Sequence, residues 1–322
     1  METVRPPASA QLQGAPPQRA QLQGAQLQGA GRDRPQSGPA VARMLVGTQL
    51  RRLREARDVT AKDAGDAIRG SSSKISRMEC GRTSFKLRDV TDLLSLYGVD
   101  NDDERAILLA LVEEANVPGW WDAFGDVVPR WFEDYLRLEQ AARVIRSFET
   151  QFVPGLLQTQ EYARAVIRLG YDAAPTDGVE RRVSLRMRRQ QLLRRPDPPH
   201  VWAVIDEAAL RRPIGGAATM RGQLAHLAEI SELPNITVQI MPFSAGGHAA
   251  AGGPITILRF AEDRIRDVVF LEQLNSAVYV DKPADIGRYW HVMNRLAIEA
   301  APATAAAEII HQISDQAGSR RP

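Results

Sequence analysis

The segment from residue 60 to 82, TAKDAGDAIRGSSSKISRMECGR, constrains this chain more than any other stretch. It reads as a short helix, a tight turn and a second helix over 72–80. Thr60 and Ser71 stand where they can cap the two helices, because a hydroxyl oxygen accepts a hydrogen bond from the free N–H groups of a first helical turn. Two short helices joined in this way form the helix-turn-helix that many DNA-binding domains use.

The second helix of this segment has two distinct faces. At 3.6 residues per turn, Ile75 and Met78 fall together and are predicted to point inward. The opposite face presents Ser72, Ser73, Lys74 and Arg77. An arginine can bind the O6 and N7 atoms of guanine with two hydrogen bonds, and a serine can contact a base edge or a phosphate. We therefore expect Arg77 to read bases, and Ser72 and Ser73 to contact either bases or phosphates.

The surroundings of the segment support this interpretation. Amphipathic helices are predicted over 45–57, 87–99 and 102–116, which gives five helices in all. Residues 41–99 carry 12 Lys and Arg against 7 Asp and Glu, a net charge of +5, although the whole chain has only +2. Local charge governs attraction to phosphates, because salt screens charges beyond a Debye length.

The segment resembles the helix-turn-helix of phage-repressor-like regulators of the XRE type. The resemblance implies base-reading positions at Ser72, Ser73 and Arg77, and an acidic residue, Glu79, that pairs with Arg54 of the first helix. It also implies phosphate contacts from Thr60 and from the loop cations Arg82 and Lys86. The predicted DNA contacts are Thr60, Ser71, Ser72, Ser73, Lys74, Arg77, Arg82 and Lys86.

Three positions depart from the pattern of these regulators. Ala61 stands where a Gln usually follows the N-cap, Ala64-Gly65 replaces the usual Leu-Ala pair, and the turn Gly is shifted to Gly70. These departures bear on which residues touch bases more than on the motif itself.

Composition excludes several classes of protein. No apolar run is long enough to span a bilayer, and no secretory signal pattern is present, which predicts a cytoplasmic protein without membrane association. A single cysteine, Cys80, excludes an intramolecular disulfide and a Cys-rich zinc site. The five histidines lack metal-ligand spacing, so no metal and no cofactor are predicted.

Composition also divides the chain into segments. Residues 1–43 repeat QLQGA three times and are rich in Pro, Gly and Gln, which predicts a disordered tail, and 316–322 are expected to form a second one. The DNA-binding domain is assigned to 44–116 and a second domain to 118–315. In this second domain a long helix is predicted over 130–147, with further helices over 158–169, 178–194, 220–233, 284–300 and 303–315. Strands are predicted over 201–206, 236–243, 255–260, 268–274 and 277–281. Clustered strands after helices predict that the second domain is α+β with a mostly antiparallel sheet. The domain before it is predicted to be all-α, with five helices arranged as in the lambda repressor.

The second domain also resembles a known group. The stretches VPGLLQT, RMRRQQLL, VIDEAALRRPIGG and PNITVQIMPF, followed by a Gly-rich loop, are similar to the C-terminal domain of antitoxin-like regulators from actinobacteria, the WhiJ type. The resemblance spans about residues 45–315. It implies a small protein partner encoded nearby and no catalytic chemistry.

Two features of this domain are candidate sites. Residues 181–195 carry seven arginines and no acid. They could bind an acidic partner or make a second contact with DNA. The alternative is a solvated helix face whose arginines pair with nearby carboxylates such as Glu180. Arg186, Arg189 and the loop residue His248 are the candidate partner or ligand contacts. Asp206-Glu207 is interpreted as a helix N-cap rather than an acid–base pair.

The sequence thus predicts a sequence-specific DNA-binding transcriptional regulator, not an enzyme. We expect a homodimer on double-stranded DNA, with the second domain binding a small protein or an effector. One alternative is an enzyme whose catalytic α+β domain is targeted by the DNA-binding module. Another is an interaction hub whose DNA module has degenerated.

Overall fold

The computed structural model describes residues 39–170, 176–263 and 265–319. These described residues belong to one compact unit. The predicted tail over 1–38, with its QLQGA repeats, lies outside the described residues, as does the end of the chain from 320.

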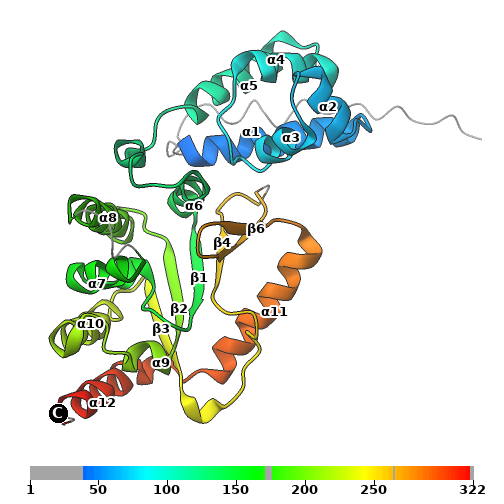
Figure 1. Cartoon of the computed structure of the whole chain (residues 1–322). Helices are drawn as coiled ribbons and strands as arrows, with labels where there is room; N and C mark the ends of the chain where they lie inside the picture. The colour runs from blue at the N-terminus through cyan, green and yellow to red at the C-terminus, as the bar shows by residue number, and fades with distance from the viewer. Residues whose placement is uncertain (1–38, 171–175, 264, 320–322) are drawn as a thin grey trace, which may run out of the picture. The chain divides into compact units, whose positions relative to one another are not determined.

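Five helices form the N-terminal part, as the sequence predicts (Figure 1). They are α1 (Pro39–Ala56), α2 (Ala61–Ala67), α3 (Ser72–Glu79), α4 (Leu87–Leu96) and α5 (Asp102–Ala115). Their apolar faces meet in one core, in which Leu50, Ile75 and Met78 are almost wholly buried. This core orients α3 and leaves its other face outside.

The first helix begins earlier than the sequence suggests. The sequence predicts a disordered tail that includes residues 39–43, but these residues form the first turn of α1. Ala42 is fully buried in the core, and the guanidinium of Arg43 donates from Nε and Nη2 to the carbonyl of Ala115, at 3.0 and 2.5 Å. These contacts hold the start of the helix, although its composition continues that of the tail.

The C-terminal part alternates helices and strands. Its helices are η2 (Trp120–Phe124), α6 (Arg130–Ala141), η3 (Gly155–Leu157), α7 (Gln160–Gly170), α8 (Thr176–Arg189), η4 (Gln190–Arg194), α9 (Glu207–Arg211), α10 (Gly216–Ile230), η5 (Phe243–Ala245), α11 (Pro283–Glu299), η6 (Ala303–Ala305) and α12 (Ala306–Ser319). Its strands are β1 (Val144–Glu149), β2 (His200–Asp206), β3 (Ile236–Met241), β4 (Ile255–Arg259), β5 (Val268–Glu272) and β6 (Ala277–Val280). Because α12 runs to Ser319, the predicted tail from 316 is helical over its first residues.

The six strands form one sheet in the order β3-β2-β1-β4-β5-β6. The first three strands are parallel, and the other three pairings are antiparallel, so the α+β fold with a mostly antiparallel sheet is confirmed. Helices α7, α8, α10 and α12 line up along one side of the sheet and α11 crosses the other (Figure 1). Among the described residues, no helix is long and apolar enough to cross a membrane.

The central strand β1 is the main correction to the predicted elements. The sequence predicts one helix over 130–147, but α6 ends at Ala141 and β1 follows. Ile145 packs on one face of the sheet and Phe148 on the other, so the strand is buried on both sides. Its partners β2 and β4 are distant in the sequence, and the local pattern therefore gave no sign of the pairing.

Candidate DNA-binding surface

The two helices of the motif begin at the predicted caps. The Thr60 hydroxyl accepts a hydrogen bond from the Asp63 backbone N–H at 3.1 Å and donates to the Asp63 carboxylate at 2.6 Å. The Ser71 hydroxyl accepts from the Lys74 backbone N–H at 3.2 Å. Both side chains are exposed, and each satisfies a free donor of the first helical turn.

The close approach of α2 to the start of α3 explains one departure from the regulator pattern, the glycine at position 65. Arg69 has a φ of +53°, a left-handed conformation that L residues other than Asn and Asp seldom adopt. A Cβ atom added at Gly65 would lie 2.8 Å from the backbone carbon of Ser71. Gly65 therefore permits α2 to approach the first residue of α3 closely, which a side chain at this position would prevent.

The outer face of α3 consists of Ser72, Ser73, Ser76 and Arg77. All four side chains are exposed, and among the described residues none of them makes a hydrogen bond or an ion pair. Their donors and acceptors are therefore free for another molecule. Ser76 was not predicted as a contact, although its spacing of four residues from Ser72 places it on the same face.

Lys74, another predicted DNA contact, is paired within the fold. Its ammonium group lies 2.5 Å from the carboxylate of Asp89, which is only 8 % exposed. The pair joins α3 to α4. A phosphate would have to compete with Asp89 for this cation.

Arg82 is likewise held away from solvent. Its Nη2 atom lies 3.3 Å from the Asp281 carboxylate, and its guanidinium carbon lies 4.8 Å from the centre of the Tyr279 ring. Only 17 % of the Arg82 side chain is exposed. A phosphate would have to compete with Asp281 for this cation.

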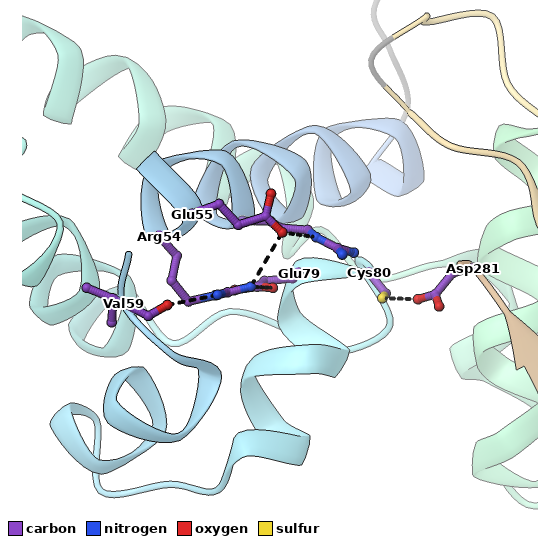
Figure 2. A network of polar contacts seen from close by, with 7 residues as sticks. Arg54, Glu55, Val59, Glu79, Cys80 and Asp281 are labelled. Atoms are coloured by element: carbon purple, nitrogen blue, oxygen red, sulfur yellow. Dashed lines mark hydrogen bonds and ion pairs between the residues drawn. The ribbon is translucent and has the colours of Figure 1, made fainter. Parts of the chain in front are cut away.

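The same carboxylate holds the end of α3. The Cys80 thiol donates a hydrogen bond to Asp281 Oδ2 at 2.6 Å, as Figure 2 shows. Burial, together with this hydrogen bond, raises the pKa of the Cys80 thiol to about 12. The thiol is therefore protonated at neutral pH and serves as a donor, and it lacks the thiolate that reactive cysteines use.

Glu79 and Arg54 lie together at the base of the recognition helix. Arg54 donates to both carboxylate oxygens of Glu79, at 2.5 and 2.9 Å, and to the Val59 carbonyl at 2.9 Å (Figure 2). The hydrogen bond to Glu79 raises the pKa of Arg54 above its usual value. The pair ties α3 to α1, which is the structural role that the resemblance implies.

Lys86, the other predicted loop cation, is exposed before α4, and the described residues offer it no partner.

In the second domain, the structure separates the two candidate arginines. Arg189 is buried and binds both carboxylate oxygens of fully buried Glu139, at 3.0 and 2.7 Å. It is therefore a structural residue and not a surface contact for a partner. Arg186 is half-buried and donates to the side chain of Gln158 at 2.8 Å, and burial lowers its pKa to about 10.

The third candidate, His248, is used within its own loop. Its Nδ1 atom accepts from the Ala250 backbone N–H at 3.3 Å, and its Nε2 atom lies 3.8 Å from Asp206 Oδ2. The other oxygen of Asp206 accepts from the Ala208 backbone N–H at 2.8 Å, which makes Asp206 the N-cap of α9. These contacts position the loop after β3 against the end of β2.

The fold and this surface define a helix-turn-helix protein with an appended α+β domain. Residues 45–108 match a helix-turn-helix domain, and residues 132–312 match a domain of unknown function, DUF5753. The second match covers more than half of the chain, so the chain belongs to the DUF5753 family. No curated protein and no solved structure matches it.

Proposed function

We propose that this protein is a sequence-specific DNA-binding transcriptional regulator. The observation that carries the proposal is the outer face of α3, where three hydroxyls and one guanidinium point outward without partners among the described residues. A helix of this kind fits the major groove, where Arg77 would bind a guanine and the serines would contact bases or phosphates. The match to a helix-turn-helix domain supports the same function.

The finer parts of the proposal rest on the sequence. The protein binds a two-fold symmetric site as a homodimer, and it is antitoxin-like: its DUF5753 domain binds a small protein encoded nearby or another effector. The resemblance to WhiJ-type regulators supports this assignment. We propose that the domain acts by binding rather than by catalysis, since Asp206 and His248 are both occupied in positioning a loop.

Selection of genomic DNA fragments by the purified full-length chain at physiological salt tests DNA recognition. We expect enrichment of a short palindrome. Arg77→Ala should lower affinity for that site by about 1–3 kcal/mol, roughly 5- to 150-fold. The matched control is Arg88→Ala, which removes an exposed arginine of α4 whose Nε lies 3.8 Å from Asp92. Retention of DNA without an enriched sequence, or an Arg77→Ala variant with unchanged specific affinity, would contradict the proposal.

Partner binding has its own test. The full-length chain should co-purify with the product of the neighbouring gene after co-expression. The absence of a complex at micromolar concentrations of both proteins would remove the small protein from the proposal and leave the DNA-binding part untouched.

A further inference from the structure

A cavity of about 400 Å³ lies between α1, the end of α3 and the chain that enters β5. Cavities of roughly 300–1,000 Å³ are the size that holds small molecules in proteins. Its apolar wall is formed by Met44, Ile265 and Val268. None of the contacts described for the DNA-binding surface fills this space.

Three arginines also line the cavity. Arg51 donates to the Glu55 carboxylate at 2.8 Å, so its charge is balanced within α1. Arg52 and Arg266 are exposed and take part in no hydrogen bond or ion pair within the described ranges. The hydrogen bond from Arg51 lowers the pKa of Glu55, and Arg266 adds only a small, longer-range attraction in the same direction.

The other carboxylates of the cavity are already paired. Glu79 is bound by Arg54, and Asp281 accepts from Cys80 and Arg82. Since each acid of the lining has its own cation, the charges of Arg52 and Arg266 remain uncompensated. The cavity therefore combines an apolar wall with an excess of positive charge.

We infer that this cavity binds a small organic anion with an apolar body. Its anionic group, a carboxylate, sulfonate or phosphate, would be held by Arg52 and Arg266, because guanidinium groups form charge-assisted hydrogen bonds with such oxygens. Its apolar body would lie against Met44, Ile265 and Val268.

The position of the cavity gives the ligand a route to the recognition helix. Cys80 and Asp281 both line the cavity, and their hydrogen bond holds the residue that directly follows α3 (Figure 2). The end of α3 has a state in which this hydrogen bond holds it and a state in which it is released. A ligand that binds one of these states more tightly than the other shifts the equilibrium between them, and the affinity for DNA changes with it. This consequence, though not the binding itself, rests on the proposed function.

The test uses anilinonaphthalene sulfonate, an aromatic anion whose fluorescence rises in apolar surroundings, added to the full-length protein. We expect saturable binding of one probe per chain. Arg52→Ala and Arg266→Ala should each weaken binding by about tenfold, since each removes a charge-assisted contact. Neutral phenylnaphthylamine, which lacks the sulfonate, should bind the wild type and both variants equally.

Arg88→Ala again serves as the control, because it removes an exposed arginine that does not line the cavity. This variant should bind the probe as the wild type does. Both tested arginines are exposed, so circular dichroism should show an unchanged fold. Probe binding that does not saturate, or that is the same in all variants, would overturn the inference.

A parallel titration with the selected operator separates the two proposals. If the operator binds normally and probe binding is independent of Arg52 and Arg266, the cavity inference fails and the regulator proposal stands. If the probe depends on both arginines and no operator is found, the cavity inference stands and the regulator proposal fails.

Discussion

Two cation-bearing regions of this molecule use their charges in different ways. The outer face of α3 contains one arginine, Arg77, which makes no hydrogen bond or ion pair with the residues that the structure describes. The segment 181–195, on α8 and η4, contains seven, and several of them are engaged inside the fold. The density of cations along a sequence therefore does not locate a nucleic-acid surface; the availability of each cation does.

The partners of the α8 arginines show why the two regions differ. Arg181 pairs with Asp126 and Arg186 with Gln158, two loop residues, and Arg189 pairs with Glu139 of α6. Glu180, the acid that the sequence places nearest, binds Arg164 of α7 instead. These arginines of α8 thus bind neighbouring loops and helix α6, whereas the polar groups on the outer face of α3 have no partner among the described residues.

The largest expected effect comes from the buried pair of α8. Arg189→Met should lower the free energy of unfolding by about 3–5 kcal/mol, because it leaves the Glu139 carboxylate buried without a partner. Arg77→Ala should change it by less than about 0.5 kcal/mol. Urea denaturation of the wild type and of the two variants measures both changes in unfolding free energy.

A double variant sharpens this test. Arg189→Met with Glu139→Leu should recover most of the lost stability, since no unpaired charge is left in the interior. Equal losses in Arg189→Met and Arg77→Ala would show that the two regions do not differ in the way the contacts indicate.

A second effect depends on pH and on the carboxylate facing α8. Burial, with a smaller contribution from Glu272, raises the pKa of Glu149 from 4.5 to about 8, and Arg186 opposes the shift. The folded state therefore binds a proton that the unfolded state releases above pH 4.5. Stability contributed by this proton is lost as the pH rises from about 5 to about 8.

Glu149→Gln should remove this loss. Between pH 5 and 8 the wild type should lose on the order of 1–3 kcal/mol more unfolding free energy than the variant. Glu272→Gln is the control for the neighbouring carboxylate, whose pKa is also raised by burial and whose removal should have a smaller effect. Parallel profiles for wild type and Glu149→Gln would mean that Glu149 stays ionised in the folded protein.

These contacts also show which parts of the molecule the sequence could predict. The caps Thr60 and Ser71 and the inward residues Ile75 and Met78 follow local rules of spacing, and the structure places them as expected. The five strands after residue 200 were found within two residues of their ends for the same reason.

The remaining features depend on residues that are distant in the sequence. Lys74 pairs with a residue 15 positions away, and Arg82 with one 199 positions away, so no local pattern separates them from free cations. Arg146 of β1 is buried with its guanidinium 4.2 Å from the Trp202 ring. A charged residue in a strand buried on both faces contradicts the usual pattern, so the sequence does not predict this strand.

Arg82 extends the comparison between free and engaged cations, because the sequence predicts it as a DNA contact and the structure pairs it with Asp281. Asp281→Asn should free it and raise affinity for random duplex DNA by about two- to fivefold, as expected for an ion pair worth up to about 1 kcal/mol. Fluorescence anisotropy at constant salt measures the change.

Removing any carboxylate near DNA also strengthens binding, so Arg82 itself must be tested. In an Arg82→Ala background, Asp281→Asn should leave affinity unchanged. Asp285→Asn, which removes a carboxylate from the first turn of α11, is the matched control. If Asp281→Asn has the same effect with and without Arg82, the ion pair does not withhold this cation from DNA.

The smallest effect separates two lysines that the sequence treats alike. Lys86 is exposed without a partner in the described part of the chain, and Lys74 is paired with Asp89. Lys86→Ala should weaken binding to all DNA sequences and reduce the slope of log affinity against log salt by about 1, because one fewer phosphate contact releases one fewer counterion. Lys74→Ala should leave the slope unchanged and lower stability instead. A slope that falls equally in both variants would mean that the Lys74–Asp89 pair opens on DNA. A cation that is engaged in the free protein would then still contact phosphate in the complex.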